Sequence, residues 1–214
     1  MDREHYRGDF MFKVYRNAFH NNNIYIDFEN EDIGSLPSFR DLADSYGVPL
    51  QHMLDGKDDL KRDFVSKNGF KLMRTCYVCE FSFSDMRLRP CHTKIKRAVK
   101  NHEFSWAYYL HYKKMHQAIN PLTASFDEFV KILPDEVYYL DEKNFAFVED
   151  NEIAYVLAED SLMGDDFLYA LCQAIFNNYD TIVFEADDVD PIAMRLKNNF
   201  LNGFIETTET WIYK

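Results

Sequence analysis

The stretch that decides the fold runs from Asn151 to Phe204 and reads NEIAYVLAEDSLMGDDFLYALCQAIFNNYDTIVFEADDVDPIAMRLKNNFLNGF. Residues 151–158 are mostly apolar, with β-branched and aromatic side chains, and they predict a strand. A short turn at 161–164 follows. Apolar residues then recur at spacings of three and four over 167–176, which predicts a helix.

The second half of the stretch repeats this alternation. Residues 181–185 predict a second strand, and the pair Asp190-Pro191 is a helix-start signal. Gly203 stands where the C-terminus of a helix needs a positive φ. A last strand is predicted at 207–213. The order is therefore strand, helix, strand, helix, strand.

This order, with Gly203-Phe204 after the second helix, resembles the C-terminal half of the GNAT acyltransferase fold. Members of that family bind acetyl-CoA between two central strands that splay apart. Their loop before the first helix commonly reads Arg/Gln-x-x-Gly-x-Gly/Ala, and its N–H groups hold the pyrophosphate, as helix N-termini bind anions generally. The matching positions here are Ser161 to Asp166, in which Gly164 fits. Ser161 replaces the basic or amide residue, and Asp166 replaces the small one.

The resemblance also implies a cofactor site. The backbone of the first strand would line the pantetheine of acetyl-CoA, and the turn at Gly164 would approach the diphosphate. The residues implied to contact the cofactor are Tyr155, Val156, Leu157, Ala158 and Gly164.

Many members of the family use a tyrosine of the second helix as general acid, in a pattern like Asn-x-x-Ala-x-x-Leu-Tyr. Here Ala193 and Leu196 fit, and Lys197 occupies the tyrosine position. A lysine protonates a thiolate at neutral pH only if burial lowers its pKa. The alternative is an ordinary solvent-facing helix residue.

A general base would be a carboxylate near the splayed strands. Glu152 and Glu159 flank the candidate cofactor strand, although acids beside a strand ordinarily serve only solubility. The predicted catalytic residues are Glu152, Glu159 and Lys197. His111 and His116 lie five apart in a predicted helix and are interpreted as surface or packing residues.

An earlier part of the chain partly repeats this pattern. Residues 28–33 align with 184–189, and Asn68-Gly69-Phe70 aligns with Asn202-Gly203-Phe204. The alternative is chance, since Gly after a helix followed by an apolar residue is common. The repeat predicts an α/β fold with a mixed central sheet flanked by helices. A truncated GNAT-like copy at 1–86 and a basic linker at 87–103 would precede a fuller copy at 104–214.

The basic linker is the one basic block in an acidic chain. Its two readings are a solvated segment near acidic neighbours and an anion contact. Its cations are Arg87, Arg89, Lys94, Lys96, Arg97 and Lys100.

Cysteine spacing raises a competing hypothesis of a zinc-stapled structural protein. Cys76, Cys79, Cys91 and His92 have the ligand types of a tetrahedral zinc site. Residues three apart on a strand point to opposite faces, however, and 71–81 reads as a strand. We therefore expect no metal site.

The composition bounds the remaining classes. The 214-residue chain carries a formal net charge of −12, which disfavours nucleic acid and favours a cationic substrate. No apolar run approaches the ~18 residues of a membrane helix, and no secretory signal is apparent, so a cytoplasmic location without membrane contact is expected. The predicted function is acetyl transfer from acetyl-CoA to a small-molecule or peptide amine. The alternative is a noncatalytic GNAT-like module that binds another ligand or a protein partner.

Overall fold

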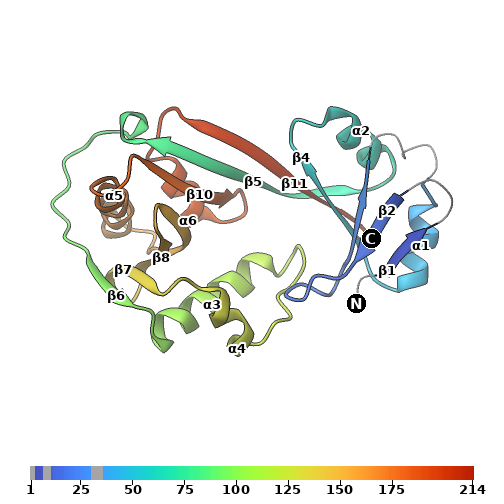
Figure 1. Cartoon of the computed structure of the whole chain (residues 1–214), viewed down its shortest axis with the longest axis horizontal. Helices are drawn as coiled ribbons and strands as arrows, with labels where there is room; N and C mark the ends of the chain where they lie inside the picture. Colours follow the sequence, from blue (N-terminus) through green and yellow to red (C-terminus); the bar gives the residue numbers. More distant parts are fainter. Residues whose placement is uncertain (1–2, 7–10, 30–35) are drawn as a thin grey trace. The chain divides into compact units, whose positions relative to one another are not determined.

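A computed structural model describes residues 3–6, 11–29 and 36–214 of the chain. The chain divides into two compact units. Unit 1 takes in Met1–Thr75, His116–Ala124 and Thr207–Lys214, and unit 2 takes in Cys76–Met115 and Ser125–Glu206. The elements carry the labels of Figure 1.

Unit 1 is built on five strands in the order β1-β2-β3-β4-β11. The pairs are antiparallel except for β3 and β4, which run parallel. The strands are β1 (Arg3–Tyr6), β2 (Met11–Tyr15), β3 (Ile24–Phe28), β4 (Leu50–Asp55) and the later part of β11 (Phe204–Tyr213).

Two helices complete unit 1. Helix α1 (Phe39–Tyr46) begins at the cap Ser38 and ends at Gly47, whose φ of 64° is left-handed. Helix α2 (Asp59–Lys67) begins at the cap Asp58. Both place aromatic residues in one buried cluster with the strands, as ordinary amphipathic helices do.

Unit 2 repeats the same mixture of strand directions. Its strand order is β5-β10-β9-β8-β7-β6, antiparallel throughout except for the parallel pair β9 and β10. The strands are β5 (Lys71–Ser82), β6 (Lys96–Val99), β7 (Glu136–Asp141), β8 (Asn144–Glu149), β9 (Glu152–Leu157) and β10 (Thr181–Asp187).

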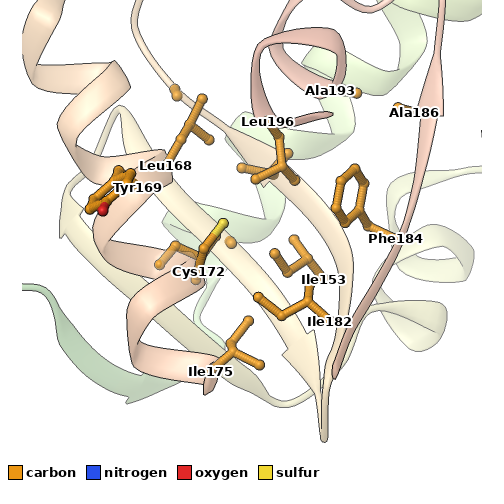
Figure 2. Packing of buried hydrophobic residues seen from close by; sticks show 14 of the residues in the cluster. Ile153, Leu168, Tyr169, Cys172, Ile175, Ile182, Phe184, Ala186, Ala193 and Leu196 are labelled. Carbon is orange, nitrogen blue, oxygen red and sulfur yellow. The ribbon is translucent and has the colours of Figure 1, made fainter. Parts of the chain in front are cut away.

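Helices lie on both faces of this sheet. Helices α5 (Leu162–Phe176) and α6 (Pro191–Lys197) pack on one face, where Ile153, Ile182 and Phe184 meet Leu168 and Leu196 (Figure 2). The other face receives the aromatic side chains of α3 (His102–His116), α4 (Phe126–Phe129) and the adjoining 3-10 turn η3 (Val130–Ile132). A second 3-10 turn, η2 (Phe83–Asp85), follows β5. The predicted α/β fold with a mixed sheet flanked by helices is confirmed.

Three predicted boundaries differ from the structure. Helix α5 starts at Leu162 rather than Phe167, because the Ser161 side chain caps it by accepting from the N–H of Gly164 at 3.1 Å. Helix α6 ends at Lys197 rather than Phe200. Strand β6 forms within the segment predicted to be a linker.

The alignment behind the predicted repeat does not match the order of elements. Residues 28–33 were aligned with the end of β10, but Ile24–Phe28 is β3, the strand before the parallel partner. The partner is β4, which the sequence analysis left unassigned. Asn30 to Ile33 lie outside the described residues. The repeat itself and the domain boundaries stay predictions.

Candidate functional site

Strands β9 and β10 separate soon after they meet. They pair in register only at Glu152–Val183 and Ile153–Phe184. Strand β9 then carries a bulge, because Phe147 and Val148 of β8 stand opposite Tyr155 and Ile153 and leave Ala154 as an extra residue. A bulge bends its strand and ends regular pairing. The later residues of β9 therefore have no register partner on β10, and a wedge opens between the two strands.

Helix α5 begins just beyond the end of β9, and its first turn has spare donors. Ser161 satisfies the N–H of Gly164, the third residue of the helix. Within the described part of the chain, the N–H groups of Leu162 and Met163 have no acceptor. Unpaired donors at a helix N-terminus, together with the positive end of its dipole, suit an anion.

Gly164 serves the packing of this turn. A Cβ at this position would lie 2.0 Å from the carbonyl oxygen of Glu159 and 3.1 Å from Nη2 of Arg195. Only glycine lets the chain after β9 close this tightly on the helix start. The N–H of Gly164 is already bonded to Ser161, so the neighbouring N–H groups are the ones left for a ligand.

The two aspartates of the turn are held by arginines and do not cap their own helix. Asp165 Oδ1 accepts from Arg195 Nε at 2.9 Å and Nη2 at 2.7 Å. Arg195 of α6 also donates to the Glu159 carbonyl at 2.8 Å. Asp166 Oδ1 accepts from Arg89 Nη1 at 2.5 Å, and Arg89 lies 4.6 Å above the ring of Tyr169. Both carboxylates are thus neutralised away from the spare donors.

The other cations of the basic segment are also engaged within unit 2. Arg97 pairs with Glu136 at 2.5 Å, which raises the pKa of that guanidinium, and Lys100 pairs with Asp135 at 3.0 Å. Lys96 lies 5.8 Å from the ring centre of Tyr139. These contacts agree with the reading of this segment as cations near acidic neighbours.

The face of the wedge opposite α5 and α6 is aromatic and acidic. The ring of Tyr155 lies 5.0 Å from the ring of Tyr108 on α3. Ile182, Phe184 and Ala186 pack on the α5 face, so the alternation of the strand places Glu185 on the α3 face. Burial, with help from Glu185 and Glu152, raises the pKa of Tyr155.

A histidine–aspartate pair joins α3 to the start of α6. His111 Nε2 donates to Asp190 Oδ2 at 3.0 Å, and both side chains are largely buried. Asp190 caps α6 through the N–H groups of Ile192 at 2.8 Å and Ala193 at 3.4 Å. Burial opposes the charge of Asp190, but the hydrogen bond from His111 and the two N–H groups outweigh it and lower the pKa of the carboxyl.

Solved structures share this arrangement. A GCN5-related N-acetyltransferase from Sphaerobacter thermophilus matches with a TM-score of 0.51 and 8% identity, over 94% of this chain and 75% of that one. A proposed acetyltransferase from Pyrococcus horikoshii matches with a TM-score of 0.53 and 15% identity, over 95% and 69%. The chain has the GNAT fold. No family model and no curated protein matches the sequence.

In this GNAT fold, the three predicted catalytic residues are placed apart. Glu152 stands at the paired end of the wedge, opposite Val183, and burial together with Glu185 and Glu149 raises its pKa. Glu159 lies before α5 and accepts from Lys143 at 2.8 Å. Lys197 lies 4.5 Å from the ring centre of Tyr77 on β5. Their catalytic roles stay predictions.

Sequence reasoning missed the side chains that α3 brings to the wedge. Tyr108 and His111 are three residues apart, which places them on one helix face, and their ring centres lie 5.6 Å apart. Asp190 was used only as a helix-start signal. That spacing was the available clue, but nothing in the sequence connects this helix to the turn after β10.

A cavity of about 570 Å³ lies elsewhere in unit 2 and includes none of the residues of β9 and β10. It reaches the helix start only at Glu159 and Met163. Its lining carries Glu103, Asp141, Glu142 and Glu159 against the single cation Lys143, so it does not suit a diphosphate.

The cysteines show no arrangement for zinc. Within the residues that the structure describes, no three His, Cys, Asp or Glu side chains form a group that could hold a metal ion. Burial raises the pKa of Cys79 to about 11, so this thiol stays protonated. The Cys76 thiol contacts Glu185 at 3.7 Å. Separately, none of the described helices has both the length and the apolar character of a membrane span.

Proposed function

We propose that unit 2 binds an acyl-CoA in the wedge between β9 and β10 and transfers the acyl group to an amine. The observation that carries this proposal is the loss of pairing after Ile153–Phe184, caused by the bulge at Ala154. A bulge that leaves one strand edge unpaired in the middle of a sheet costs hydrogen bonds, and such features mark functional sites.

The pantetheine arm fits this edge because it is peptide-like. Its two amides offer the donors and acceptors that a neighbouring strand would supply, and the β10 side of residues 155–157 has no strand partner in register. The diphosphate would then reach the N–H groups of Leu162 and Met163. Arg195 and Arg89 support this by neutralising Asp165 and Asp166.

The acceptor would approach from the α3 face. Glu185 and Asp187 follow the last paired residue of β10, and Asp190 caps the next helix. Carboxylates on this side favour a cationic amine over a neutral or anionic acceptor. Attack on a thioester mainly requires orientation and deprotonation of the amine, which a rigid cleft provides.

The first test is calorimetric titration of the whole chain with acetyl-CoA. We expect micromolar affinity, weakened about tenfold in Leu162→Pro, because proline removes one N–H from an anion site. Proline is tolerated at the first residue of a helix, so the fold should survive. Leu162→Ala removes the same exposed side chain but keeps the N–H, and should bind like the wild type. No binding at millimolar acetyl-CoA would reject the proposal.

A noncatalytic GNAT-like module is the second candidate. It is favoured by Lys197, which stands where the family pattern has tyrosine and lies over the ring of Tyr77. Tight binding of acetyl-CoA without CoA release across a panel of primary amines would support this candidate against the enzyme.

A further inference from the structure

One buried polar group on the α3 face of the wedge has no hydrogen-bond partner. The side chain of Tyr108 is 6% exposed, yet its hydroxyl makes no hydrogen bond to any described residue. The comparable Tyr169 is 1% exposed and accepts from the backbone N–H of Arg89 at 3.0 Å. Buried tyrosine hydroxyls ordinarily find a partner, because leaving one unpaired costs free energy. Tyr108 therefore calls for a functional explanation.

The surroundings of this hydroxyl place it at the open end of the wedge. The ring packs against Phe147 at 6.1 Å and Tyr155 at 5.0 Å. The groups that act electrostatically on the phenol include Asp190 and Asp187, at the end of β10 and the start of α6. The phenol thus lies between the later part of β9 and the turn after β10.

The same surroundings keep the hydroxyl protonated. Burial, followed by the charge of Asp190, raises the pKa of Tyr108 well above its ordinary value. The group is a hydrogen-bond donor and a proton source at any physiological pH. His111, one helical turn along α3, holds Asp190 and so fixes α3 against the turn that carries these charges.

We propose that the Tyr108 hydroxyl contacts the thioester sulfur of the bound acyl-CoA and protonates it as it leaves. This inference rests on the proposed function. The amine nitrogen forms a bond to the acyl carbon, and the C–S bond breaks with its electron pair going to sulfur. Tyr108 gives its proton to that sulfur and regains one from the nitrogen of the adduct, so the products are an amide and CoA thiol. The acid comes from α3, across the wedge from Lys197's helix.

The test compares CoA with desulfo-CoA, which lacks the sulfur, by calorimetry at pH 9. At this pH a large part of the thiol is ionised and accepts a strong hydrogen bond. We expect the wild type to prefer CoA by about tenfold, since a hydrogen bond to a charged group has about this effect. Tyr108→Phe should remove the preference and leave desulfo-CoA affinity unchanged. Tyr109→Phe, 8% exposed on the same helix, is the matched control and should keep the preference.

Three results would overturn the inference. Tyr108→Phe could keep the preference for CoA, or it could weaken both ligands equally, as a structural role would. If neither ligand binds the wild type, the proposed function fails and the inference fails with it. The variant is expected to fold, because no hydrogen bond to the described residues is lost; its unfolding temperature should not fall below that of Tyr109→Phe.

Discussion

The two units contain the same parallel strand pair with opposite outcomes. In unit 1, β3 and β4 pair at Ile24–Leu50 and Tyr25–Gln51. In unit 2, β9 and β10 pair at Glu152–Val183 and Ile153–Phe184. Each pair stops after two positions, so the backbone alone does not distinguish them. The difference lies in the residue that follows the last pair.

In unit 1 that residue is His52, which closes the gap. Its Nδ1 donates to the carbonyl of Ile26 at 2.9 Å, and its ring stacks on Phe28 at 4.3 Å. In unit 2 the residue is Glu185, an exposed carboxylate that makes no such link across the strands. Strand β3 also lacks the bulge that bends β9. Divergence of two parallel strands thus gives a site only where no side chain replaces the missing pairing.

The largest effect expected from this comparison is on stability. His52→Ala leaves the Ile26 carbonyl unpaired and a void beside Phe28, and should lower the free energy of unfolding by about 2–4 kcal/mol. Glu185→Ala, at the same place in the other pair, should change it by less than about 0.5 kcal/mol because the side chain is exposed. Urea unfolding followed by circular dichroism measures both. Equal losses would show that His52 does not replace strand pairing.

Two helix-associated glycines offer a second, smaller contrast. Gly164→Ala places a Cβ against the Glu159 carbonyl and should destabilise by about 1–3 kcal/mol, because a backbone atom must move. Gly47→Ala meets nothing within 4 Å but has φ at 64°, and should cost about 1 kcal/mol from conformation alone. Thermal unfolding would separate the two. A Gly164→Ala protein as stable as the wild type would show that the turn before α5 is not tightly closed.

The same two pairs show what the sequence could predict. Strands β9 and β10 are continuous apolar or β-branched runs, so their existence and order were evident. Strand β4 reads Leu-Gln-His-Met-Leu-Asp and was missed, since Gln51 and His52 look like surface residues. Both are buried because distant groups satisfy them: Asn23 and Asn120 donate to Gln51, and Ile26 accepts from His52. Local patterns do not encode such partners.

The candidate site was predictable to the same extent. The cofactor strand and the turn at Gly164 follow from local pattern and family resemblance. The arginines that neutralise Asp165 and Asp166 come from positions 30 and 77 residues away, and Tyr108 comes from a helix before the cofactor strand. Long-range electrostatics decided whether the turn suits an anion, and the sequence left that question open.

The smallest predicted effect is a pH dependence confined to unit 1. Burial lowers the pKa of His52 and His20, although the carbonyls of Ile26 and Asn120 partly oppose the shift. Above the unfolded value of about 6.5, both states are neutral and stability is at its full value. As pH falls below 6.5, the unfolded chain binds protons first, so stability falls until the folded pKa values are passed. In unit 2 the signs differ: the lowered pKa of Asp190 costs stability only below about pH 3.8, and the raised pKa of Glu152 gives stability back as pH falls. Hydrogen exchange between pH 7.5 and 5.5, corrected for intrinsic rates, should therefore lose protection in β3 and β4 and keep it in β9 and β10. In His52→Ala the loss should shrink to the part that His20 contributes. An equal loss of protection in both strand pairs would mean that neither histidine is responsible, and the role assigned to His52 between the strands of unit 1 would have to be given up.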